Sequence, residues 1–125
     1  MPTTKKPALR TDRLAALQAA LERFAAARDW QQFHTPKNLA MALSVEAAEL
    51  LEQFQWLTAE QSAMLDARTR EAVAHELADV FLYLLRLSDM LKIDLLHAAE
   101  RKMRINARKY PVRKSRGHAR KYTAL

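Results

Sequence analysis

Residues 36–56 read PKNLAMALSVEAAELLEQFQW, and the apolar residues among them recur at steps of three and four. That spacing is the period of an α-helix with one buried face. Residues 69–91, TREAVAHELADVFLYLLRLSDML, repeat the pattern. Thr35 followed by Pro36 indicates where the first stretch begins, because threonine caps helices and proline is favoured at their first position. The sequence therefore predicts two long helices, which the short connector between them would make antiparallel neighbours.

Shorter helices are predicted around this pair, at residues 11–28, 59–66 and 95–109. Their capping residues would be Thr11, Thr58 and Asp94, and Pro111 would stop the last of them. The chain shows no strand-like alternation and no internal repeat. We therefore predict an all-α fold, an antiparallel four-helix bundle with an irregular C-terminal arm.

Composition agrees with an all-helical protein and excludes several classes. Half of the residues are apolar and only one is glycine, a balance that favours helices. The absence of cysteine excludes disulfides, thiol catalysis and cysteine metal sites. The longest apolar run, Val80–Leu85, is far too short to cross a bilayer, and residues 1–10 lack the apolar region of a secretory signal. We therefore expect a cytoplasmic protein without a membrane partner.

Positive charge is concentrated at the C-terminal end of this chain, whose formal net charge is +7. Residues 101–125 contain ten Lys or Arg and no acid. Such a segment can bind the phosphates of a nucleic acid, or it can hold the phosphates of a nucleotide above an acidic metal site. Composition alone does not decide between a nucleic acid and a nucleotide as the ligand. The expected organisation is a flexible basic N-terminus (1–10), a helical domain (11–111) and a basic C-terminal arm (112–125).

Two acidic pairs, Glu46-x-x-Glu49 and Glu76-x-x-Asp79, lie within the two long helices. The i, i+3 spacing points both carboxylates of a pair from one helical face. An isolated pair of this kind usually belongs to a solvated surface or forms ion pairs, here with Arg70 or Arg86. Both pairs, however, border apolar stripes, and clustered carboxylates are costly unless a cation neutralises them. Oxygen-only ligands suit Mg²⁺ or Mn²⁺, and the Glu-x-x-His motif of di-iron bundles is absent.

Several other residues are candidates for binding a nucleotide. Lys102 and Asn106 share one face of the last predicted helix, and Lys109 follows a turn later. Two tryptophans, Trp30 and Trp56, flank the second helix, and His34 lies just before it. Tyr83 lies near the second acidic pair. Their rings can stack on a base, although Trp30 and Trp56 can equally close the ends of the core.

The chain resembles the all-α, MazG-like nucleoside triphosphate pyrophosphohydrolases, and within them the dCTP pyrophosphatases. The resemblance covers nearly everything from Leu14 onward. It is carried by the two acidic motifs on neighbouring helices, by the Trp-rich flanks and by the ending. The matching stretches are RDWQQFHTPKNL (28–39), EAAELLEQFQW (46–56), ELADVFLY (76–83), KMRINARKYPV (102–112), SRG (115–117) and KYT (121–123).

The resemblance implies a ligand set and an assembly. It implies that Mg²⁺ is bound by the four acids Glu46, Glu49, Glu76 and Asp79. It also implies that Lys102 and Asn106 contact the nucleotide, and that Trp30, Trp56 and Tyr83 form the base pocket with His34 nearby. Members of the family are generally homotetramers, dimers of dimers, whose active sites draw on more than one subunit.

We therefore predict Mg²⁺-dependent hydrolysis of a nucleoside triphosphate, preferably dCTP or a 5-substituted dCTP, to the monophosphate and pyrophosphate. Glu46 or Glu49 would accept the proton of the attacking water. Lys102, with Lys109 or Arg116, would offset charge on the departing pyrophosphate. Two alternatives remain: the same reaction on dUTP or another non-standard triphosphate, or a non-enzymatic helical module that binds nucleic acid, a partner that we do not expect.

Overall fold

The computed structural model describes residues 10–125, with side chains from residue 13 onward. The flexible basic segment predicted at residues 1–10 lies almost entirely outside these residues. All regular structure in the described range is helical, with no strand, which confirms the all-α prediction. The elements are α1 (Arg10–Ala27), α2 (Pro36–Glu52), α3 (Ala59–Ser62), α4 (Ala67–Met90), α5 (Leu95–Lys109), α6 (Val112–Ser115) and the 3₁₀ turn η1 (Tyr122–Ala124). In this range no helix is both long and apolar enough to cross a membrane.

The predicted caps open their helices except at α1, which begins at Arg10 and so contains the predicted cap Thr11. The Thr35 hydroxyl accepts a hydrogen bond from the Asn38 amide at 3.2 Å, with Pro36 in the first turn of α2. The Asp94 carboxylate accepts one from the His97 amide at 3.0 Å and opens α5. Because each cap satisfies an amide that the helix itself cannot pair, these boundaries are set by local sequence.

Two other predicted helix boundaries, and the prediction for the C-terminal arm, were wrong. The short helix α3 has the expected capping box, but it ends at Ser62 rather than Asp66. The reason is that the Asp66 carboxylate caps the next helix, accepting from the Thr69 amide at 2.7 Å. As a result α4 begins at Ala67, two residues earlier than predicted. The arm after Pro111 was predicted to be irregular, yet it contains α6 and η1.

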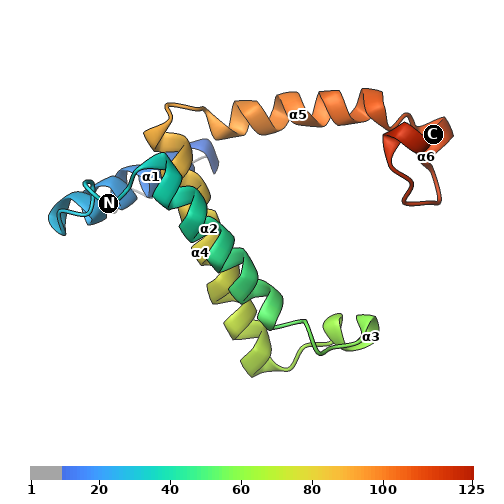
Figure 1. Cartoon of the computed structure of the whole chain (residues 1–125), viewed down its shortest axis with the longest axis horizontal. Coiled ribbons are helices and arrows are strands. Elements are labelled where there is room, and N and C mark those ends of the chain that lie inside the picture. Colours follow the sequence, from blue (N-terminus) through green and yellow to red (C-terminus); the bar gives the residue numbers. More distant parts are fainter. Residues whose placement is uncertain (1–9) are drawn as a thin grey trace, which may run out of the picture. The chain divides into compact units, whose positions relative to one another are not determined.

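The chain divides into two units, which are described separately. The first extends to Lys92 and holds α1 to α4. In it α2 and α4 run antiparallel along their length, and α1 packs against α4 (Figure 1). The apolar side chains buried between these helices are Ala25, Leu39, Val73 and Leu85. Leu77, which the spacing places on the same stripe of α4, is 52% exposed.

The second unit runs from Ile93 to Leu125 and holds α5, α6 and η1. Near the end of α5 the rings of Tyr110 and Tyr122 meet edge to face, with centroids 6.0 Å apart. The Lys109 ammonium lies 4.7 Å from the centre of the Tyr122 ring, within the range of a cation–π interaction. These contacts hold η1 against the C-terminal turn of α5, which explains why the arm is ordered into turns.

Candidate functional site

Three carboxylates from two antiparallel helices converge in the first unit. Glu46 and Glu49 come from α2 and Glu76 from α4, and one oxygen of each lies within 4.8 Å of the others. All three side chains are half-buried. The spacing of three residues brings Glu46 and Glu49 to one face of α2, and the antiparallel packing of α4 sets Glu76 opposite them. We call these three residues the acidic cluster.

The electrostatics of the acidic cluster favour a bound cation. Burial, followed by a hydrogen bond and repulsion from Glu49, raises the pKa of Glu46 from 4.5 to about 7. Burial and the charge of Glu49 also raise the pKa of Glu76. The Oε2 atoms of Glu46 and Glu76 are buried and have no hydrogen-bond partner. Because buried polar atoms are normally satisfied, two orphaned carboxylate oxygens in an oxygen-only cluster fit a hard divalent cation such as Mg²⁺.

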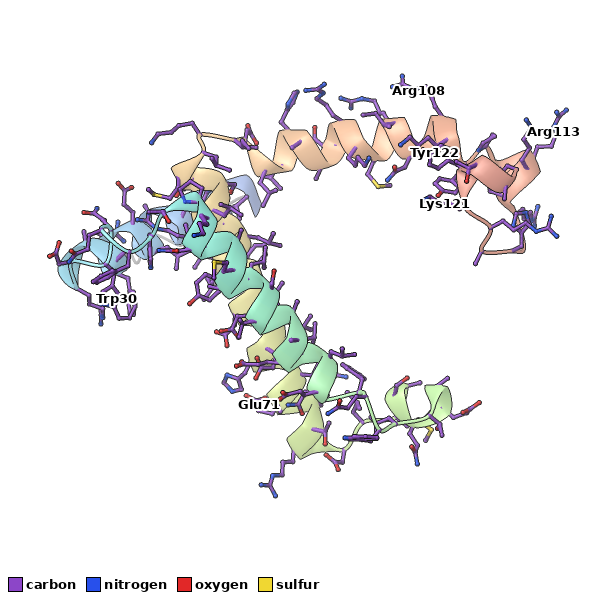
Figure 2. All side chains as sticks on the ribbon, in the orientation of Figure 1. Trp30, Glu71, Arg108, Arg113, Lys121 and Tyr122 are labelled. Atoms are coloured by element: carbon purple, nitrogen blue, oxygen red, sulfur yellow. The ribbon has the colours of Figure 1, made fainter. Side chains whose placement is uncertain are left out.

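The alternative to a metal site was that the acidic residues form ion pairs with Arg70 or Arg86. These ion pairs are not formed. Among the side chains of residues 13–125, no Arg or Lys lies within ion-pair distance of Glu46, Glu49, Glu76 or Asp79. The salt bridge in this range joins Glu71 to His75 at 3.1 Å and is an ion pair only when His75 is protonated; both side chains are exposed. Figure 2 shows Glu71 on the surface of α4. The repulsion within the acidic cluster is therefore not relieved by the chain's own cations in this range.

Asp79 acts on the acidic cluster through its charge and also lines a cavity. It is not one of the three converging carboxylates, but its charge contributes to the raised pKa values of Glu46 and Glu76. It also lines a cavity of about 250 Å³. The nine lining residues, which come from α1, the following connector and α4, are Leu21, Phe24, Ala25, Trp30, His34, Asp79, Leu82, Tyr83 and Arg86. Largely apolar walls with a few polar groups are typical of a small-molecule site.

Three of the predicted base-binding residues, Trp30, His34 and Tyr83, meet in this cavity. The Trp30 ring packs edge to face on Phe24 with centroids 5.7 Å apart, and it lies 6.2 Å from the His34 ring. Trp30 is 42% exposed, and Figure 2 shows its side chain just beyond the C-terminal end of α1. The Trp30 ring is therefore fixed by its contact with Phe24 but still accessible, and it lines the same cavity as the Asp79 carboxylate. Such a ring is suited to stacking a base.

Arg86 is the polar residue of the cavity that sequence reasoning missed. It was considered only as an ion-pair partner of the acids, yet its Nε donates a hydrogen bond to His34 Nδ1 at 3.1 Å. Burial and the Arg86 charge lower the pKa of His34, so the ring is neutral and can accept this bond. The available signal was an arginine inside the apolar run FLYLLRL, at residues 81–87.

The other predicted substrate-binding residues are not brought to this cavity by contacts within the first unit. Trp56 is 87% exposed and does not line it. Lys102, Asn106, Lys109 and Arg116 belong to the second unit. There Lys109 contacts Tyr122, Asn106 is half-buried, and Lys102 and Arg116 are exposed. The roles of these five residues stay predictions.

The pKa of Glu46 predicts how the metal-free protein responds to pH. The folded chain holds this proton with a pKa of about 7, against 4.5 in the unfolded chain. Protonation therefore favours folding, a contribution that is complete below the unfolded value and lost as pH rises through the folded one. In the presence of a chelator, we expect the melting temperature of the wild-type protein, measured relative to that of Glu46→Gln, to fall between about pH 5 and about pH 8, because the opposite effect of the lowered pKa of His34 is common to both proteins. Circular dichroism would measure it.

The matched control for this experiment is Glu46→Gln, which removes the titrating group and should flatten the slope. Added Mg²⁺ should raise the melting temperature most at the alkaline end, where the acidic cluster is fully charged. A metal-free difference in melting temperature between the wild-type protein and Glu46→Gln that rises over this range would contradict the electrostatic description of the cluster.

Comparison with known proteins gives consistent results. The model of the MazG-like family matches residues 41–125. The chain is 47% identical over 104 residues to dCTP pyrophosphatase 1 of Bos taurus, and 46% identical over 104 residues to that of Homo sapiens. These alignments cover 82% of this chain but only 62% and 61% of the relatives, so the chain spans less than two thirds of their length.

A solved structure is also similar. The crystal structure of a pyrophosphatase from Archaeoglobus fulgidus matches with a TM-score of 0.75 and 39% sequence identity. The match covers 87% of this chain and 99% of that one. The comparisons of sequence and of fold therefore both find proteins that are named pyrophosphatases.

Proposed function

The chain belongs to the MazG-like family, and from this premise we propose that it is a nucleoside triphosphate pyrophosphohydrolase that requires Mg²⁺. Its preferred substrate would be dCTP or a 5-substituted dCTP, cleaved to the monophosphate and pyrophosphate in the cytoplasmic nucleotide pool. The acidic cluster carries the proposal, because two of its buried oxygens, those of Glu46 and Glu76, lack partners and because Asp79, whose charge acts on both residues, lines the aromatic cavity. The names of the curated relatives, dCTP pyrophosphatases, support the substrate.

In this proposal the metal would be held by Glu46, Glu49, Glu76 and Asp79. When bound, it would neutralise charge on the phosphate oxygens and favour attack by water on the α-phosphorus. Glu46 or Glu49 would accept the proton of that water, since both lie at the centre of the charged site. The cavity beside Asp79 would receive the base, with Trp30 and Tyr83 providing its aromatic walls and His34 nearby.

The second unit would contribute positive charge. Residues 101–125 contain ten Lys or Arg and no acid, and this excess suits a pyrophosphate leaving group. Lys102, Lys109 and Arg116 are the residues that we propose for this role, and Asn106 would hydrogen-bond the nucleotide. Trp56, exposed at the end of α2, would complete the base pocket.

The experiment that tests this function measures pyrophosphate release from dCTP, 5-methyl-dCTP, dUTP, dTTP and the purine triphosphates, with and without Mg²⁺. We expect release from dCTP that depends on the metal. Release from dUTP or another triphosphate alone would keep the reaction and change the substrate. No release at all, together with DNA or RNA binding that is weakened by salt and independent of metal, would favour the non-enzymatic alternative.

We also propose that the chain assembles as a homotetramer, a dimer of dimers. Large apolar side chains remain exposed at four-residue steps on both long helices: Met41 and Val45 on α2, and Leu77 and Phe81 on α4. Stripes of this kind on a single chain are typical of surfaces that another subunit covers.

Substituting Phe81→Glu should therefore lower the molecular mass measured by size-exclusion chromatography with light scattering. A charge placed in an apolar interface would remain unpaired and desolvated. The same experiment on Glu71→Lys, a charge change at an exposed position of the same helix, should leave the mass unchanged. A wild-type protein that is monomeric at all concentrations would contradict the proposed assembly.

A further inference from the structure

Arg86 is a buried cation without an acidic partner. Its exposed fraction is 6%, and no carboxylate in the described part of the chain lies within ion-pair distance of it. Buried charges are normally paired. The hydrogen bond from Nε to His34 uses one of the five guanidinium N–H groups, and within residues 13–125 the other four have no hydrogen-bond partner. The Nη atoms are not among the fully buried atoms without a partner.

Arg86 is part of the candidate base site. Arg86 lines the same cavity as Trp30, His34 and Tyr83, whose rings provide apolar walls. The hydrogen bond to His34 holds the guanidinium at the wall of the cavity, because His34 is itself a lining residue. On another side Arg86 borders Glu22 and Asp89 at a separate small cavity, without forming an ion pair with either. The cavity is therefore lined both by aromatic rings and by an arginine whose Nη groups have no partner within residues 13–125.

We propose that Arg86 is a specificity-determining residue that donates two parallel hydrogen bonds to O2 and N3 of a cytosine ring. This inference rests on the proposed function and deepens it. Cytosine presents adjacent acceptors at O2 and N3, and a planar guanidinium is matched to such a pair. Uracil and thymine carry a hydrogen on N3, so one guanidinium donor would face another donor. Guanine has a comparable pair at O6 and N7 but is a larger, two-ring base.

Comparing dCTP with dUTP isolates this hydrogen-bond pattern, because cytosine and uracil are nearly equal in size. A bidentate pair of this kind discriminates between bases by on the order of ten- to a hundredfold. The quantity to measure is the ratio of kcat/KM for dCTP to kcat/KM for dUTP, with both values from one preparation. This ratio does not depend on the folded fraction, so a destabilised variant still gives an answer.

The decisive variant is Arg86→Lys, which keeps the positive charge and loses the planar fork. We expect it to lower the dCTP-to-dUTP ratio by about tenfold or more, and Arg86→Gln to lower it similarly. Arg70→Lys, the same change at an exposed position of α4, is the matched control and should leave the ratio unchanged. An unchanged ratio in both Arg86 variants, with both substrates slowed equally or neither slowed, would overturn the inference, as would a wild-type protein that does not prefer dCTP.

A separate binding measurement distinguishes failure of this inference from failure of the proposed function. If the wild-type protein hydrolyses no triphosphate, the proposed function fails, and Arg86 is then tested by calorimetric titration with dCMP and dUMP in the presence of a chelator. Tighter binding of dCMP, reduced in Arg86→Lys but not in Arg70→Lys, would support the role of Arg86. Equal or undetectable binding of the two nucleotides would overturn it.

Discussion

Replacing Glu49 with Gln is expected to lower the rate of pyrophosphate release from dCTP by about 10²- to 10⁴-fold, the range for loss of a general base. Glutamine keeps the size of the side chain but can neither accept the proton of water nor contribute charge to a metal site. Glu46→Gln should have a similar effect, because both residues belong to the acidic cluster. The measurement is steady-state pyrophosphate release at saturating Mg²⁺.

The melting temperatures of these variants show whether a loss of activity comes from unfolding. Because the carboxylates of the acidic cluster repel one another, each amide variant should be at least as stable as the wild-type protein when metal is absent. Loss of activity with an unchanged or raised melting temperature would thus identify a chemical defect and not a folding defect. Glu71→Gln, on the exposed face of α4, is the control and should retain full activity. Near-normal turnover by both cluster variants would remove Glu46 and Glu49 from the proposed mechanism.

Removing divalent cations is expected to reduce turnover to background, and Mg²⁺ or Mn²⁺ should restore it. Without a cation, the negative cluster would repel the triphosphate, and its two unpartnered oxygens would stay unsatisfied. Binding should also stabilise the fold, by about 2.7 kcal/mol when the free metal is at 100 times its dissociation constant. Thermal unfolding and calorimetric titration would measure this stabilisation independently of activity.

This prediction fails if turnover persists in excess chelator. It also fails if calorimetry shows no uptake of Mg²⁺ or Mn²⁺, even in the presence of an unhydrolysable triphosphate analogue. In the calorimetric experiment, the double variant Glu46→Gln with Glu76→Gln is the appropriate control, because it removes both carboxylates whose oxygens lack partners.

Features that depend on neighbouring residues could be predicted from the sequence. Thr35 and Asp94 cap their helices as expected, because a cap needs only the side chain and an amide three residues later. The convergence of Glu46 and Glu49 likewise follows from helical spacing. The end of α3 could not be predicted in this way, because Asp66 was compatible with the end of one helix and the cap of the next.

Apart from the antiparallel pairing of the two long helices, features that depend on packing between helices could not be predicted. Whether Asp79 joins the carboxylate cluster or lines the cavity depends on the register of α4 against α2 and α1. The role of Arg86 depends on the connector after α1, which brings His34 within 3.1 Å of its Nε. The expected core position Leu77 is half-exposed because α1 and α2 do not cover that side of α4 within one chain.

The acidic cluster and the cavity are built from different helices, so substitutions in one helix need not affect both. The acidic cluster uses only α2 and α4, whereas five of the nine cavity residues come from α1 and its connector. Asp79 is the acid that belongs to the cavity and also influences the cluster. Under the proposed function, substitutions along α1 would therefore alter which base is accepted, while the residues proposed for hydrolysis would stay in place. New substrate preferences would then require no change to the acidic cluster.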